Sequence, residues 1–290
     1  MKKKKLRIGE KSIESVMLIC ALVSVAAVLL ITYLIFAEGL PVFSKVSLWD
    51  FISGTKWQPN KHIFGIFPMI VGSIYTTIIA LIIGIPIGLG CAVFLAEIAP
   101  KRLSKVLRKS IEILAGIPSI VYGFFGMAVL VPFIRSFNQG PGFSVLAAGL
   151  ILAIMILPTI ISISEVSLRM VPTTYKDGSL ALGASNWQTI KKVSIPTAKS
   201  GIWAGVILGI GRAIGETMAV ILVAGNSPII PMSLFQPVRT LTVNVVIEMA
   251  YVSTGSDHYH ALFATAIVLF VFVMIINAAV VILSRQKVRV

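Results

Sequence analysis

The chain is poor in charge, cysteine and histidine, and these shortages exclude most soluble functions. Only 12% of its 290 residues are charged, about half the share in soluble domains, whereas 57% are hydrophobic. Its two cysteines, Cys20 and Cys91, lie inside apolar runs, so there is neither a disulfide framework nor a thiolate metal site. The three histidines, His62, His258 and His260, form no metal-ligand cluster with acids or thiols. We therefore expect an integral membrane protein that needs no metal and no cofactor.

The sequence also lacks catalytic motifs. No Gly-x4-Gly-Lys-Ser/Thr phosphate loop is present, so we do not expect ATP to bind by that route. No Ser-His-Asp, Cys-His or paired-carboxylate arrangement falls in a plausible pocket. The string from Gly209 to Gly215 is similar to a dinucleotide fingerprint, but its last glycine is one residue late and no strand precedes it. We interpret it as a set of helix-packing glycines and predict that the chain is not an enzyme.

Long uncharged runs are what the sequence has instead. A membrane helix needs about 20 apolar residues, and the pattern predicts an all-α integral membrane protein with six transmembrane helices at 17–37, 66–96, 113–134, 145–164, 200–225 and 261–284. The stretch 97–112 is expected to be a basic loop. We divide the chain into an N-terminal tail, first span and external amphipathic segment (1–65), a core of five spans (66–284) with a cytoplasmic loop (165–199), and a basic tail (285–290).

The formal net charge of +14 is a signal of membrane topology. Nineteen of the 25 Lys and Arg residues fall in the two tails and the loops 97–112 and 165–199, whereas five fall in the three segments on the opposite side. Cytoplasmic segments carry the excess of Lys and Arg, so both termini and the 165–199 loop are expected in the cytoplasm of a cell-membrane protein. Since no soluble domain carries the basic residues, we expect no nucleic-acid partner.

The polar segment 177–196 has a helix–Gly–helix–Pro pattern. Ser185 is placed to cap a helix, Gly183 interrupts the preceding one, and Pro196 closes the segment. This segment resembles the ATPase-coupling loop of ABC importer permeases, whose pattern is Glu-Ala-Ala, three residues, Gly, nine residues, Ile, one residue, Leu-Pro. The positions that match in spacing are Asp177, Gly178, Ser179, Gly183, Val193, Ile195 and Pro196.

Two charged residues lie inside the fifth predicted span. Arg212 and Glu216 are four residues apart, so in a continuous helix they would share one face with Gly205 and Gly209. A charged side chain at mid-membrane costs about 2.5–3.5 kcal/mol even on lenient scales, and such groups usually face the protein interior and serve function. We expect an ion pair here, which either belongs to a substrate route or fixes helix packing.

The string GIGRAIGETMAV around this pair resembles the fifth-span signature of phosphate importer permeases, and Gly72 to Thr77 is similar to the opening of the importer permease core. The segment from Trp57 to Thr77 resembles the PstC type more than the PstA type. The resemblance implies a type I ABC importer permease fold in which Arg212 and Glu216 lie on the phosphate route, and we assign the neighbouring Gly209 and Thr217 to it as well. It also implies four partners: a PstA-like second permease, a PstB-like ATPase dimer, an extracytoplasmic PstS-like phosphate-binding protein and the lipid bilayer.

Three other functions remain open at this stage. The same architecture could serve another oxyanion, although a polyamine would not favour Arg212 on its route. A secondary anion transporter could use Arg212 and Glu216 as a proton-coupled pair, but it would need no coupling loop. A membrane sensor is weakened by the lack of a signalling domain. We predict a permease subunit of an ATP-driven importer that forms, with a second permease, the pathway for inorganic phosphate.

Overall fold

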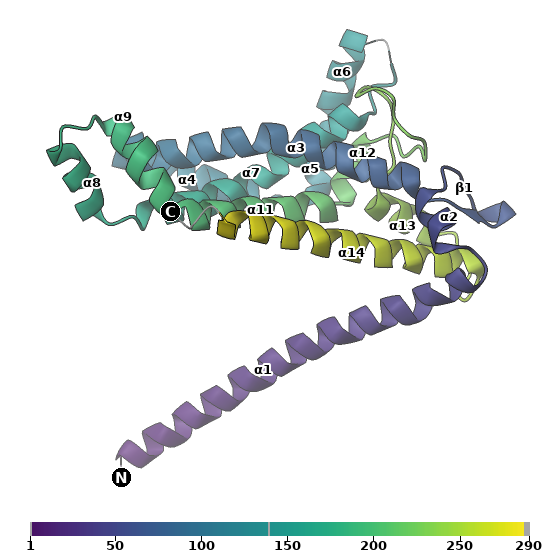
Figure 1. The fold of residues 1–290 in the computed structure, drawn as a ribbon, viewed down its shortest axis with the longest axis horizontal. Coiled ribbons are helices and arrows are strands. Elements are labelled where there is room, and N and C mark those ends of the chain that lie inside the picture. The colour runs from purple at the N-terminus through teal and green to yellow at the C-terminus, as the bar shows by residue number, and fades with distance from the viewer. Residues whose placement is uncertain (1, 139, 287–290) are drawn as a thin grey trace.

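The computed structural model describes residues 2–138 and 140–286, and these form a helical bundle with one small hairpin (Figure 1). The first part of the chain contains α1 (Lys2–Gly39), η1 (Leu40–Ser44), α2 (Leu48–Ser53), β1 (Trp57–Gln58), η2 (Pro59–Lys61), β2 (Ile63–Phe64), α3 (Phe67–Val93), η3 (Phe94–Ile98) and α4 (Lys101–Gly116). The middle contains α5 (Ser119–Phe125), η4 (Gly126–Leu130), α6 (Val131–Asn138), α7 (Val145–Arg169), α8 (Thr173–Ala181) and α9 (Asn186–Thr189). The last part contains η5 (Ile190–Ser194), α10 (Ile195–Thr197), α11 (Lys199–Gly215), α12 (Met218–Val223), α13 (Leu241–Met249) and α14 (Asp257–Gln286).

The all-α membrane fold predicted from the sequence is confirmed. Five helical segments of the described chain are long and apolar enough to cross a membrane: Ile13–Ser44, Phe67–Ile98, Ser119–Phe137, Val145–Arg169 and Asp257–Ala278. A sixth is counted if Asn186–Thr197 and Lys199–Gly215, which meet at 69°, form one bent span. The predicted C-terminal tail lies outside the described residues from position 287 onward.

The predicted boundaries on both sides of position 112 were wrong. The stretch 97–112 was expected to be a loop, but most of it belongs to helix α4, which continues to Gly116. Ile117 and Pro118 then adopt extended backbone, and the third span starts only at Ser119. The physical reason is Pro118, which disfavours helical geometry in the residue before it. Residues 113–116 therefore form the last turn of the amphipathic helix α4 and are not the beginning of the third span.

Helix α7 is the centre of the bundle. In its most apolar stretch 61% of residues are buried, against 28% in the spans 67–98, 119–137 and 257–278. Glycines on its neighbours let it approach closely: an added Cβ at Gly88 of α3 would lie 2.9 Å from Ile160, and one at Gly209 of α11 would lie 3.0 Å from the same side chain. Ile160 is thus held between two spans by glycines that leave room for it.

The two ends of the bundle differ. Figure 1 shows α8 and α9 at one end and the β1–β2 hairpin with α2 at the other. Helix α1 begins and α14 ends toward the α8–α9 end, so both ends of the described chain point the same way (Figure 1). At the hairpin end, Phe51, Trp57 and Phe64 pack into a small core with the start of α14. Elsewhere α1 projects away from the bundle, and none of its most apolar window is buried.

We predict that Gly88→Val destabilises the permease by about 1–3 kcal/mol, since the new side chain overpacks the contact with Ile160. Gly90→Val, two residues on in the same helix, is the matched control, because an added Cβ at Gly90 meets no atom within 4 Å. Thermal unfolding of the two purified variants measures the difference. Equal melting temperatures would contradict the close packing of α3 on α7.

Candidate functional site

Arg212 lies in α11 and faces the central helix. Its Nη1 donates a hydrogen bond to the Thr159 hydroxyl of α7 at 3.3 Å. Gly205 and Gly209, on the same face, pack against Ile163 and Ile160 of α7, as the predicted helix face requires. The side chain of Arg212 is half-buried. The structure therefore holds a guanidinium inside the span bundle, in contact with one neutral hydroxyl.

The expected ion pair between Arg212 and Glu216 is not formed, and that prediction was wrong. Helix α11 ends at Gly215, and Glu216 has extended backbone with ψ of 132°, so the spacing of four no longer places the two side chains on one helix face. Two contacts hold the break: the Thr242 hydroxyl donates to the Glu216 carbonyl oxygen at 3.1 Å, and the Glu216 carboxylate accepts the Ala219 N–H at 3.2 Å. Among the described residues no carboxylate lies within 4.0 Å of Arg212.

Thr217 lies at the same break, directly before α12. Its hydroxyl donates to the Gly215 carbonyl oxygen at 3.4 Å, and its side chain is partly exposed. Sequence reasoning missed Thr159, the polar partner of Arg212, and Thr242, the residue from α13 that reaches the break. The sequence did mark Thr159 as unusual, because it is the first polar residue in the apolar run that starts at Val145 and it directly follows Pro158. Thr242 carried no comparable signal.

One face of α11 is left uncovered by the described residues. Ala204, Leu208 and Gly215 are exposed, and an added Cβ at Gly211 or Gly215 would meet no atom within 4 Å. The opposite face is buried against α7 and α14. Of the predicted packing glycines, Gly209 therefore packs inside the chain, whereas Gly211 and Gly215 line the open side. Arg212 lies between the packed face and the open one.

The segment 177–196 has the helix–Gly–helix pattern that the sequence predicted. Asp177, Gly178 and Ser179 lie in α8, Gly183 has a φ of +83° between α8 and α9, and Ser185 caps α9 in a reciprocal capping box with Gln188. The remaining predicted positions, Val193 in η5 and Ile195 and Pro196 in α10, lie directly before α11. The capping box and the left-handed glycine fix the angle between the two short helices.

This loop exposes apolar side chains that no part of the described chain covers. The exposed fractions are 91% for Leu182, 61% for Trp187 and 57% for Tyr175. Asp177 and Gly178 are exposed beside them, whereas the Ser179 hydroxyl is 3.0 Å from that of Thr189 and joins the two helices. Clustered apolar side chains on a polar loop mark a protein-interaction surface.

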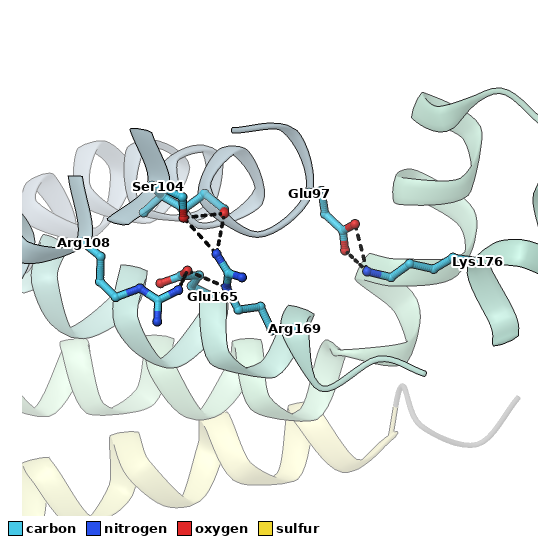
Figure 2. A network of polar contacts seen from close by, with 7 residues as sticks. Glu97, Ser104, Arg108, Glu165, Arg169 and Lys176 are labelled. Carbon is cyan, nitrogen blue, oxygen red and sulfur yellow. Dashed lines mark hydrogen bonds and ion pairs between the residues drawn. The ribbon is translucent and has the colours of Figure 1, made fainter. Parts of the chain in front are cut away.

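A buried carboxylate lies where α4 crosses the end of α7 (Figure 2). The Glu165 side chain is 3% exposed and forms ion pairs with Arg108 of α4 and, at 2.8 Å, with Arg169 one turn further along α7. Arg169 also donates to the Ser104 hydroxyl at 2.8 Å and to the Leu95 carbonyl oxygen at 2.9 Å. Sequence analysis ended the span at Ser164 and assigned Glu165 to the loop, so it missed this network.

A second ion pair joins the loop helix α8 to the end of the first core span. The Nζ of Lys176 lies 2.8 Å from Glu97 Oε1 and 2.9 Å from Oε2, and the two side chains are 21% and 9% exposed (Figure 2). Glu97 belongs to η3, which directly continues α3. A largely buried contact thus joins α8 to the end of α3. Among the described residues no group of three or more His, Cys, Asp or Glu side chains is placed to hold a metal ion.

The comparisons with known proteins identify this architecture. The family described as "Binding-protein-dependent transport system inner membrane component" matches residues 84–289. The chain belongs to this permease family. The family resemblance seen in the sequence is thereby confirmed, and the loop 177–196 and the helix that carries Arg212 both lie within the matched residues.

Similar proteins cover most of the permease. The probable ABC transporter permease protein YqgH of Bacillus subtilis is 41% identical over 278 residues, which are 93% of this chain and 89% of that protein. The phosphate transport system permease protein PstC of Haemophilus influenzae is 37% identical over 256 residues, or 81% and 79% of the two chains. A structure of the inward-facing MetNI methionine ABC transporter superposes with a TM-score of 0.60 at 19% identity, covering 81% of this chain and 100% of that one. This last likeness shows the type I importer fold.

We predict that Glu165→Gln destabilises the permease by about 3–5 kcal/mol, because it leaves Arg108 and Arg169 facing each other without a buried counter-charge. Glu112→Gln on the exposed side of α4 removes the same charge and should change stability by less than about 0.5 kcal/mol. Thermal unfolding of both purified variants is the measurement. A Glu165→Gln variant as stable as Glu112→Gln would show that the network contributes nothing to the bundle.

Proposed function

We propose that this permease forms, with a second permease subunit, the transmembrane pathway for inorganic phosphate in an ATP-driven importer. The observation that carries the proposal is the uncompensated Arg212. A lone guanidinium among membrane spans is unfavourable by several kcal/mol unless a counter-charge reaches it. The described residues supply a hydroxyl there and no carboxylate within 4.0 Å, so an anionic substrate is the group that completes the site.

The donor set suits a tetrahedral oxyanion. The planar guanidinium of Arg212 offers two parallel N–H donors to two oxygens of one anion, which a lysine ammonium does not. The Thr159 hydroxyl either donates to the same anion or accepts from a protonated phosphate oxygen. The Glu216 carboxylate, displaced from Arg212, is a further acceptor at the break and would repel anions that carry no proton. These features favour phosphate over sulfate, and relatives named phosphate permeases support the same choice.

We predict that Arg212→Gln reduces phosphate uptake by at least tenfold while the complex still assembles. Arg212→Lys should lose most of the uptake as well, because a point charge does not replace the planar fork. Arg135→Gln, which removes an exposed arginine at the end of α6, is the control and should transport normally. Labelled phosphate uptake into reconstituted vesicles, with subunit stoichiometry measured on the same sample, tests this. Near-normal uptake by an assembled Arg212→Gln complex would remove this residue from the pathway.

Two uncovered apolar surfaces support a second permease subunit. The open face of α11 runs beside Arg212, and a pathway lined on one side by this face needs another subunit to close it. Helix α1 projects from the bundle with its apolar side chains exposed, so lipid or another subunit must cover it. We infer that a related permease covers the α11 face and that lipid and the same partner cover α1.

We infer further that the loop 177–196 docks an ATPase subunit in the cytoplasm and that a phosphate-binding protein docks at the hairpin end. The excess of Lys and Arg at the α8–α9 end favours this orientation, with both termini in the cytoplasm. Leu182 and Trp187 offer the apolar contacts, and the Lys176–Glu97 pair links them to α3. ATP hydrolysis is assigned to that separate subunit. This loop favours an ATP-driven importer over a secondary anion transporter, which needs no such docking surface.

We predict that Gly183→Val inserts normally but retains several-fold less ATPase subunit on purification. The φ of +83° at this position is strained for a β-branched residue, so the α8–α9 angle must change. Gly183→Asn is the matched control, since asparagine adopts the left-handed region far more readily and should retain the ATPase. Full ATPase recovery and full transport by Gly183→Val would exclude this loop as the coupling element.

A further inference from the structure

A basic pocket of about 630 Å³ lies where two membrane spans end. Its walls are formed by α4, by the residues that end the span Phe67–Ile98, and by Arg169, the last residue of the span Val145–Arg169. Because both spans stop here, the pocket lies at the depth of the lipid headgroups. It is separate from Arg212 and from the exposed apolar residues of the α8–α9 loop.

The charges that line the pocket are strongly unbalanced. Glu112 is the one acidic residue in the described lining. Five basic side chains line the same pocket: Lys101, Lys105, Arg108, Lys109 and Arg169. The two arginines are partly neutralised by the buried Glu165 beneath them. Lys101, Lys105 and Lys109 have no hydrogen-bond or ion-pair partner among the described residues and are exposed. The described residues thus leave these three lysines unpaired, and their charge is complementary to an anion.

Helix α4 also presents an apolar stripe beside its basic one. At about 100° per residue, Lys101, Lys105 and Lys109 fall within roughly 80°, and Leu103, Val106 and Ile113 fall within a neighbouring sector of roughly 80°. The apolar stripe is exposed, with exposed fractions of 41% for Leu103, 62% for Val106 and 71% for Ile113. A third sector, which contains Ser104, is buried against α7 through its contact with Arg169. A helix with adjoining basic and apolar stripes at headgroup depth is suited to the membrane interface.

We propose that this pocket binds the headgroup phosphate of an anionic phospholipid, with the acyl chains lying along Leu103, Val106 and Ile113. The basic lining alone would accept a free phosphate ion too. The apolar stripe and the headgroup depth favour the lipid, since a small hydrated ion makes no use of either. The lipid would neutralise the lysines of α4 and hold this helix against the ends of α3 and α7. This inference needs the membrane fold but not the identity of the transported substrate.

The test is a lipid titration of the purified, delipidated transporter complex in detergent, followed by native mass spectrometry. The probes are phosphatidylglycerol, phosphatidylcholine and inorganic phosphate. Each basic residue near an anionic lipid contributes about fivefold in affinity, so Lys105→Gln/Lys109→Gln should bind phosphatidylglycerol roughly thirtyfold more weakly. Lys56→Gln/Lys61→Gln removes two exposed lysines at the hairpin end and is the matched control, with unchanged affinity expected.

The outcomes separate the lipid from its alternatives. Tighter binding of phosphatidylglycerol than of phosphatidylcholine, lost in the α4 variant and kept in the control, supports the proposal. Equal affinity in the two double variants overturns it, and this is also the result expected if a partner subunit fills the pocket. Displacement of phosphatidylglycerol by millimolar inorganic phosphate overturns it as well, because the pocket would then be a free-phosphate site. None of these readouts depends on transport, so a failure of the phosphate pathway leaves the result interpretable.

Discussion

The close packing of α7 between α3 and α11 is the constraint on which the rest of the permease depends. Ile160 fits against Gly88 on one side and Gly209 on the other, and a side chain at either glycine would crowd its own contact with Ile160. Because lipid tails are as apolar as the helices, such close contacts supply much of what holds membrane spans together. The same packing brings Arg212 to Thr159, so the fit of the helices also places the charged group.

Ion pairs connect the ends of the packed spans α3 and α7 to neighbouring helices. Glu165 joins α4 to the end of α7, and Glu97 joins α3 to the loop helix α8 through Lys176. The two pairs lie close together at one end of the bundle (Figure 2). The Lys176–Glu97 pair therefore connects the exposed loop helix α8 to the packed span α3 through a largely buried contact, and the Glu165 network separately fixes α4 on α7. If the ATPase docks on this loop as proposed, the Lys176–Glu97 contact is a physical connection from the docking surface to α3.

The spans, the loop and the family could be predicted from sequence because hydropathy, charge bias and motif spacing are local signals. Ser185 and Gly183 were assigned correctly for the same reason, since a cap and a left-handed glycine act over a few residues. The ion pair of Arg212 and Glu216 was predicted wrongly, because the helix break at Glu216 depends on a contact from Thr242, a residue of another helix. Helix α4 was missed although the helical spacing of its residues was visible in the sequence. The charges in 97–112 were used only to assign the side of the membrane, and the segment was predicted to be a loop.

The most direct test of the account is the position of the anion in the assembled transporter. A cryo-electron microscopy map of the complex, trapped with phosphate by an ATPase subunit that cannot hydrolyse ATP, would locate it. The account predicts tetrahedral density within hydrogen-bond distance of the Arg212 guanidinium, between the open face of α11 and the second permease, with Glu216 still turned away at the helix break. Phosphate density elsewhere along the pathway, or an Arg212–Glu216 ion pair closed in the trapped state, would contradict it.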